Sequence, residues 1–121
     1  MESFTLYMRR LLKEKGISQQ QVFRAADISD RYGYKIISGE KHTTQRDRII
    51  KLCLAGHFSV TEANQALMLY GMSPLFEQND RDQIIQTALE SRCFEIVDVN
   101  EMLEKAGFEK LYEGKRSSDL W

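Results

Sequence analysis

Residues 18–38, SQQQVFRAADISDRYGYKIIS, predict two short helices joined by a tight turn. Ser18 follows the break Gly16-Ile17 and can cap the first helix, whose opening turn holds three glutamines. The first helix should end at Asp27-Ile28, where Ser29 can cap the second. The apolar residues of the second helix recur three to four apart, as a single buried face requires: Tyr32, Ile36 and Ile37.

A pair of short helices with a turn of three or four residues is the unit that lays its second helix in the major groove of DNA. Gly39 should end the second helix. The polar loop GEKHTTQRD follows, with Thr43 or Thr44 expected to cap the next helix. That helix should continue through an apolar run: Ile49, Ile50, Leu52, Cys53 and Leu54.

The order and spacing of these features over roughly residues 5–59 resemble the lambda-repressor-like (Xre) helix-turn-helix family. The matching features are a leading helix ending in KEKGIS, the QQQV opening, Ile28-Ser29 at the turn, Lys35-Ile36, and Ser38-Gly39 before a basic loop. The resemblance implies a lambda-repressor-like bundle and a sequence-specific DNA-binding transcriptional regulator. Its recognition helix would be Ser29–Ser38. The expected partner is double-stranded DNA.

Ten residues are candidates for contact with DNA: Gln19, Ser29, Asp30, Arg31, Tyr34, Lys35, Ser38, Lys41, His42 and Thr43. Arg31 and Lys35 are the strongest, because basic side chains pair with guanine O6 and N7. Asp30 could accept only from cytosine N4, so plain solvent exposure is its preferred interpretation. Gln19 could bond a phosphate or brace a base-reading side chain. The resemblance implies backbone contacts for the loop residues Lys41, His42 and Thr43.

Three positions depart from the family pattern: Phe23 replaces a small Ala, Asp27 a turn Gly, and Gly33 a β-branched residue or Leu. In that fold the first and last of these face each other across the helix crossing, so their volumes compensate. Asp is among the few non-glycine residues that accept the left-handed conformation of such a turn. A glycine inside the second helix costs about 1 kcal/mol relative to Ala.

The composition predicts one compact all-α body. The chain has 121 residues, of which 42% are apolar, 29% are charged and only one is proline. No apolar run approaches a membrane span, and MESFTLYMRR lacks the apolar core of a signal peptide, so a cytoplasmic protein is expected. A nucleophile with a nearby base, a glycine-rich phosphate loop and a metal quartet are all missing, so neither an enzyme nor a cofactor is expected.

The net charge of −1 hides a strong asymmetry. Residues 1–57 carry 11 Lys and Arg against 6 Asp and Glu, whereas residues 58–121 carry 6 against 12. The first half is therefore suited to a polyanion and the second half is not. Solvated surface charge is the alternative interpretation.

The two cysteines, Cys53 and Cys93, lie on the apolar sides of predicted helices and are expected to be buried thiols. Cys53 and His57 are spaced as two metal ligands on one helix would be. A structural zinc needs four ligands, however, and no second pair has suitable spacing, so no metal is expected.

Outside the central stretch, a first helix is predicted at Phe4–Lys15 with Ser3 as its N-cap, and Ser59-Val60-Thr61-Glu62 forms a capping box. An internal repeat follows. Arg46-Asp47-Arg48-Ile49-Ile50 is echoed by Arg81-Asp82-Gln83-Ile84-Ile85. Six later residues recur 36 positions on: Phe58, Asn64, Leu67, Gly71, Leu75 and Glu77 match Phe94, Asn100, Leu103, Gly107, Leu111 and Glu113.

The repeat predicts two stacked helical hairpins that extend the helix-turn-helix bundle. The expected parts are 1–57 for DNA binding, 58–113 for the packed hairpin repeat and 114–121 for a flexible tail. The acidic second half is interpreted as structural, or as a surface for a protein partner or a homodimer. The alternative to DNA binding is a protein-interaction adaptor that keeps the framework without reading DNA, an interpretation that Asp30 and Gly33 favour.

Overall fold

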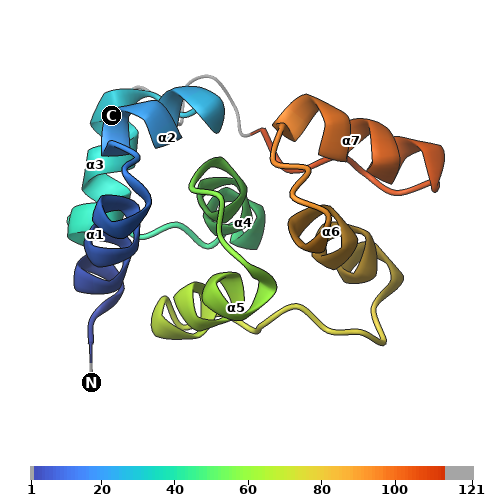
Figure 1. Ribbon diagram of the computed structural model, residues 1–121, viewed down its shortest axis with the longest axis horizontal. Coiled ribbons are helices and arrows are strands. Elements are labelled where there is room, and N and C mark those ends of the chain that lie inside the picture. Colours follow the sequence, from blue (N-terminus) through green and yellow to red (C-terminus); the bar gives the residue numbers. More distant parts are fainter. Residues whose placement is uncertain (1, 114–121) are drawn as a thin grey trace.

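The computed structural model describes residues 2–113, which form seven helices and no strand. Figure 1 shows α4 in the middle, the N-terminal helices α1 to α3 on one side and α6 with α7 on the other. The expected all-α compact body is confirmed, and the predicted tail, 114–121, lies outside the described residues. The helices are α1 (Phe4–Lys15), α2 (Gln19–Ala25), α3 (Asp30–Ser38), α4 (Arg46–Ala55), α5 (Val60–Leu69), α6 (Asp80–Glu90) and α7 (Ile96–Lys105).

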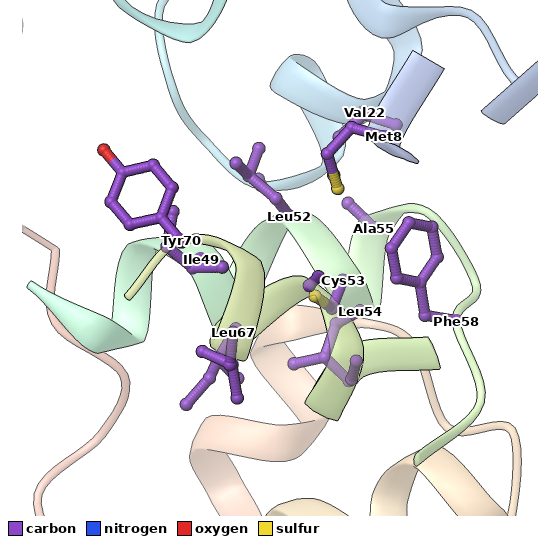
Figure 2. Packing of buried hydrophobic residues seen from close by; sticks show 14 of the residues in the cluster. Met8, Val22, Ile49, Leu52, Cys53, Leu54, Ala55, Phe58, Leu67 and Tyr70 are labelled. Carbon is purple, nitrogen blue, oxygen red and sulfur yellow. The ribbon is translucent and has the colours of Figure 1, made fainter. Parts of the chain in front are cut away.

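Helix α4 is the centre of the core. Every residue from Arg48 to Ala55 is buried, so neighbouring elements cover this helix on all sides. Figure 2 shows its side chains together with Met8 and Val22 from the N-terminal helices and with Leu67 and Tyr70 from the region of α5. The N-terminal helices and the C-terminal hairpin are thus held together by packing against one central helix.

Serine caps begin four of the helices, as the sequence predicts. Ser3 and Ser29 each accept a hydrogen bond from a backbone N–H three residues on. Ser18 and Ser59 form reciprocal capping boxes with Gln21 and Glu62. These local bonds satisfy backbone donors that a helix start leaves without an intrahelical partner.

The predicted cap of α4 was wrong. The N-cap is Gln45, and its side chain makes no capping hydrogen bond. Thr43 instead accepts a hydrogen bond from the Gln45 N–H at 3.1 Å, while its own N–H donates to the Tyr70 hydroxyl at 2.8 Å. Because Tyr70 holds this loop against the end of α5, Thr43 is buried before the helix begins.

The two predicted hairpins, α4–α5 and α6–α7, share the same stabilising contacts. The side-chain oxygen of Asn64 accepts a hydrogen bond from the Leu75 N–H at 2.9 Å, and that of Asn100 accepts one from the Leu111 N–H at 2.8 Å. Asn100 follows Asn64 by 36 residues, and Leu111 follows Leu75 by the same number. The recurring asparagines therefore fix the chain segment that follows each hairpin.

Reciprocal ion pairs join the hairpins. Arg46 donates to both carboxylate oxygens of Asp82 at 2.9 Å, and Arg81 donates to those of Asp47 at 3.1 and 2.9 Å. Each arginine also donates to two backbone carbonyls after its own hairpin, those of Ser73 and Pro74 or of Glu109 and Lys110. The repeated Arg-Asp dipeptides thus pair with each other between the two copies.

The cysteines have different environments. Cys53 is fully buried, and burial raises the pKa of its thiol far above the ordinary range. Cys93 is only half-buried and lies in the turn after α6, so its predicted place on a helix was wrong. His57 is exposed, and its ring stacks on Phe94 with the ring centroids 4.4 Å apart. Residues 2–113 contain no group of three or more His, Cys, Asp or Glu arranged to hold a metal ion.

Among the described helices, none has the length and apolar character that a membrane crossing requires.

Candidate nucleic-acid interface

The turn between α2 and α3 depends on Asp27, whose φ of 56° lies in the left-handed region. The Ile28 N–H donates to the Phe23 carbonyl at 2.9 Å, which closes the end of α2, and Ile28 is buried behind the turn. Asp tolerates this backbone conformation better than most residues with a side chain. The predicted tight turn with Asp in place of Gly is confirmed.

Phe23 and Gly33 meet where α2 crosses α3. A Cβ atom on Gly33 would lie 2.4 Å from Cδ1 of Phe23, closer than two carbon atoms can approach. The Phe23 ring is fully buried and fills the space that a larger residue at position 33 would need. The predicted exchange of volume between these two positions is therefore confirmed.

Helix α3 has one buried face and one outward face. Its buried residues are Tyr32, Gly33, Ile36 and Ile37. The outward stripe, at spacings of three and four, is Arg31, Tyr34, Lys35 and Ser38. Arg31 and Ser38 are exposed, Tyr34 is 45% exposed, and Lys35 is half-buried. Four predicted site residues are thereby brought onto one surface.

Tyr34 has a fixed place on this stripe. Its ring meets the edge of the buried Phe23 ring, with centroids 4.9 Å apart and planes 83° apart. Edge-to-face contact is a favourable arrangement for two aromatic rings. Phe23 therefore also supports an exposed side chain on the outward stripe.

Carboxylates gather at the start of α3. Ser29 caps the helix, and Asp30 accepts a hydrogen bond from the Gln20 side-chain amide at 3.0 Å. Asp27 and Asp30 line one cleft together with Glu113 from the far end of the described chain, and Arg24 is the one basic residue in that lining. This end of α3 is therefore acidic. The sequence predicted the two aspartates but gave no sign that Glu113 would join them.

Gln19 is half-buried at the first position of α2. Its side-chain oxygen is buried, and no hydrogen-bond partner for it exists among residues 2–113. Leaving a buried hydrogen-bond acceptor without a partner lowers the free energy of unfolding. Gln19 lies within the same helix pair as the outward stripe.

The loop residues after α3 are divided by burial. The Lys41 N–H donates to the Lys35 carbonyl at 3.0 Å, and the side chain of Lys41 is half-buried. His42 is exposed, and its ring stacks on Tyr70 with centroids 4.5 Å apart. Thr43 is only 5% exposed, so its side chain has no open path to a phosphate. The predicted loop contact is thus reduced to Lys41 and His42.

Three basic residues of the first half are half-buried or buried and contact other parts of the protein. Arg46 is bound to Asp82, and the Arg48 guanidinium lies between two rings, 4.8 Å from the centre of Tyr32 and 5.3 Å from that of Tyr112. Lys51 is 3% exposed, and burial lowers the pKa of its ammonium group. All three lie in α4, but only Lys51, between Ile50 and Leu52, has apolar neighbours in sequence that signal its burial.

Exposed bases remain around the helix pair. Arg9 and Lys13 lie on the outer side of α1, and Arg24 and Arg31 lie on α2 and α3. Arg10 is exposed but pairs with Glu2 and Glu14. The positive charge of the first half is therefore smaller at the surface than its composition suggests, and it is centred on α1 to α3.

Comparisons of this chain with protein-family models, with curated proteins and with solved structures found no match.

Proposed function

We propose that this protein is a sequence-specific DNA-binding transcriptional regulator of the lambda-repressor-like helix-turn-helix kind, extended by a repeat of helical hairpins. The observation that carries the proposal is the outward stripe of α3, Arg31, Tyr34, Lys35 and Ser38, on a helix packed from behind by Phe23. A helix held in this way can enter the major groove with its outward side chains against base edges.

Arg31 and Lys35 would read bases, because their charged ends can donate to guanine O6 and N7. Ser29, Ser38, Lys41 and His42 surround the stripe and would contact phosphates, which position a protein on the duplex without reading its sequence. Gln19 would contact a phosphate or brace one of the base-reading side chains.

The distribution of charge supports one orientation on DNA. Arg9, Lys13, Arg24 and Arg31 are exposed on α1 to α3, whereas the hairpin α6–α7 at the other end of the molecule is acidic. Phosphates attract the first end and repel the second. A regulator of this kind would work in the cytoplasm, alongside the DNA that it binds.

One observation favours the second candidate function, a protein-interaction adaptor that keeps the helix pair without reading DNA. Asp27, Asp30 and Glu113 line one cleft at the start of α3, where the recognition helix of a DNA binder approaches the duplex. Carboxylates there would repel phosphates unless a basic partner covers them.

The salt dependence of binding to random duplex DNA separates the two functions. A DNA binder should bind at low salt and lose affinity steeply as the salt concentration rises, because bound phosphates release counterions. Replacing a base that contacts phosphate should reduce the slope of log affinity against log salt by about 1. Lys41→Ala tests this in the loop after α3, with the exposed Arg92→Ala in the α6–α7 turn as its control. Absence of binding at low salt would favour the adaptor.

A further inference from the structure

Residues of α6 and α7 line a groove. These two helices lie on the other side of α4 from α3 (Figure 1). The groove has a volume of about 490 Å³. Ile84 and Met102 are half-buried there and form the apolar part of its lining. The other lining residues are Gln83, Thr87, Lys105 and Ala106.

The rim of this groove is acidic. On α6, Asp80 precedes Ile84 by four residues, so this carboxylate lies on the same side of the helix as the groove. On α7, Asp98 and Glu101 have the same relation to Met102 and Lys105. All three carboxylates are exposed. Lys105 is the single base in the lining, and its ammonium lies 3.9 Å from Glu101.

The surrounding segment has the same charge. Residues 77–113 hold ten Asp and Glu against four Lys and Arg. One residue of each sign is paired outside the segment, Arg81 with Asp47 and Asp82 with Arg46, so the excess of acid remains. The field at this groove therefore attracts a cationic ligand.

Charge also decides against a second copy of this chain packed groove to groove. A twofold dimer places the same surface patch of both copies together, so acidic rims would face acidic rims. Like charges brought together across an interface are unfavourable by several kcal/mol in general. The exposed apolar lining favours a bound partner, and the acidic rim favours a partner that carries positive charge.

We infer that the α6–α7 groove is the docking surface for a protein partner that presents an amphipathic helix with a basic rim. Two neighbouring helices leave a groove into which the ridge of a third can pack. The helices α6 and α7 have 11 and 10 residues, which corresponds to a length of roughly 16 Å, or three turns of a bound helix. Apolar anchors spaced three and four residues apart would contact Ile84 and Met102, and flanking Lys or Arg would face the rim.

Fluorescence anisotropy with a synthetic probe tests this surface on the full chain. The probe is a labelled peptide of Leu and Lys whose leucines fall on one helical face, and a scrambled peptide of the same composition is its control. The patterned peptide should bind at least about tenfold more tightly than the scrambled one. Equal binding of the two peptides would overturn the inference.

A substitution that adds negative charge separates the groove from simple attraction. Ile84→Glu removes an apolar contact and makes the rim more acidic, and it should weaken binding of the patterned peptide about tenfold. Val97→Glu is the matched control, because Val97 is 76% exposed on α7 and is not part of the groove. It should leave binding unchanged or slightly tighter.

Thr87→Glu repeats the test at an exposed position that cannot disturb the core, and it should also weaken binding. Unchanged or tighter binding by the groove variants would show that charge alone holds the peptide, and the groove would then not be the site. Self-association of the wild-type chain that Thr87→Glu abolishes would make a second copy the occupant, and this too would contradict the inference.

Discussion

Gly33 is required because Phe23 occupies the space next to it. Any side chain at position 33 would place its Cβ within 2.6 Å of three atoms of the Phe23 ring. The glycine costs α3 about 1 kcal/mol of helix propensity relative to Ala. That cost is offset by a large, fully buried aromatic ring at the crossing of α2 and α3.

A double-mutant cycle measures this pairing. Gly33→Ala should destabilise the protein by about 1 to 3 kcal/mol, because the new methyl group overpacks the crossing despite the better helix propensity. Phe23→Ala should cost about 3 to 5 kcal/mol through the cavity that it leaves. In the Phe23→Ala background, Gly33→Ala should be neutral or stabilising. Urea unfolding of the four proteins gives the coupling energy.

Phe58 provides the matched control for that cycle. It is also a fully buried phenylalanine, but it packs at the α4–α5 turn against Gly56. Phe58→Ala and Gly33→Ala should therefore be additive. If Phe23→Ala and Gly33→Ala were also additive, the contact between their side-chain positions would carry no energy and the account of the helix crossing would fail.

Residue patterns along the chain predicted the local features of the candidate site. The turn at Asp27 and the caps at Ser18 and Ser29 follow from residue type and short spacing, whereas the facing pair Phe23 and Gly33 was expected from the resemblance to the helix-turn-helix family. The burial of Thr43 was missed because it depends on Tyr70, which is 27 residues away and therefore leaves no pattern in the sequence near Thr43. Asp27 and Asp30 are close together in the sequence, but Glu113 joins them only through the fold.

The hairpins α4–α5 and α6–α7 are joined by reciprocal pairs, in which the arginine of each binds the aspartate of the other. Each carboxylate accepts two hydrogen bonds from an arginine of the other hairpin and one from a backbone N–H, Asp82 from Phe76 and Asp47 from Tyr112. Bidentate pairs of this kind are geometrically specific as well as strong. They fix the position of one hairpin against the other.

Asp82→Ala should destabilise the protein by about 3 kcal/mol, because it leaves the partly buried Arg46 without its carboxylate. Asp98→Ala, an exposed acid on α7, is the control and should change the free energy of unfolding by less than about 0.5 kcal/mol. Thermal or urea unfolding measures both. Equal stability of the two variants would mean that the reciprocal pairs contribute nothing to the union of the hairpins.

The same carboxylate predicts a loss of stability in acid. Burial raises the pKa of Asp82, but the hydrogen bonds from Arg46 and from the Phe76 N–H outweigh burial, so the pKa lies below its ordinary value of 3.8. The stabilisation is then fully present above the unfolded-state pKa and is lost as the pH falls through the lower folded-state pKa. Asp82→Asn should unfold with a smaller dependence on pH below about 4. An unchanged pH dependence would contradict this pKa shift.

At the scale of the whole molecule, α4 separates two surfaces of opposite character. The outward stripe of α3 and the exposed bases of α1 to α3 lie on one side, and the acidic hairpin α6–α7 lies on the other (Figure 1). The molecule can therefore bind a polyanion at one end while the other end stays available to a basic partner. Substitutions in the α6–α7 groove should accordingly leave DNA binding unchanged.

The helical class and the order of elements could be predicted because four helices begin at a capping serine and the apolar residues recur with a helical period. The echo of Arg-Asp dipeptides also predicted that two hairpins exist. It could not predict that each arginine would pair with the aspartate of the other copy, since partners 34 or 36 residues apart leave no periodic pattern. The interior roles of Arg46 and Arg48 were missed as well, because Asp82 and the rings of Tyr32 and Tyr112 come from distant parts of the chain.

Selection of bound sequences from a pool of random duplexes tests the central claim, that α3 reads DNA. The wild-type chain should enrich one defined motif. Arg31→Ala and Lys35→Ala should each weaken binding to that motif by about 1 to 3 kcal/mol and relax the preference at one base position. Arg92→Ala, the control in the α6–α7 turn, should enrich the same motif as the wild type. If the wild-type chain enriches no motif, or if both α3 variants enrich the same motif with undiminished affinity, α3 is not a recognition helix.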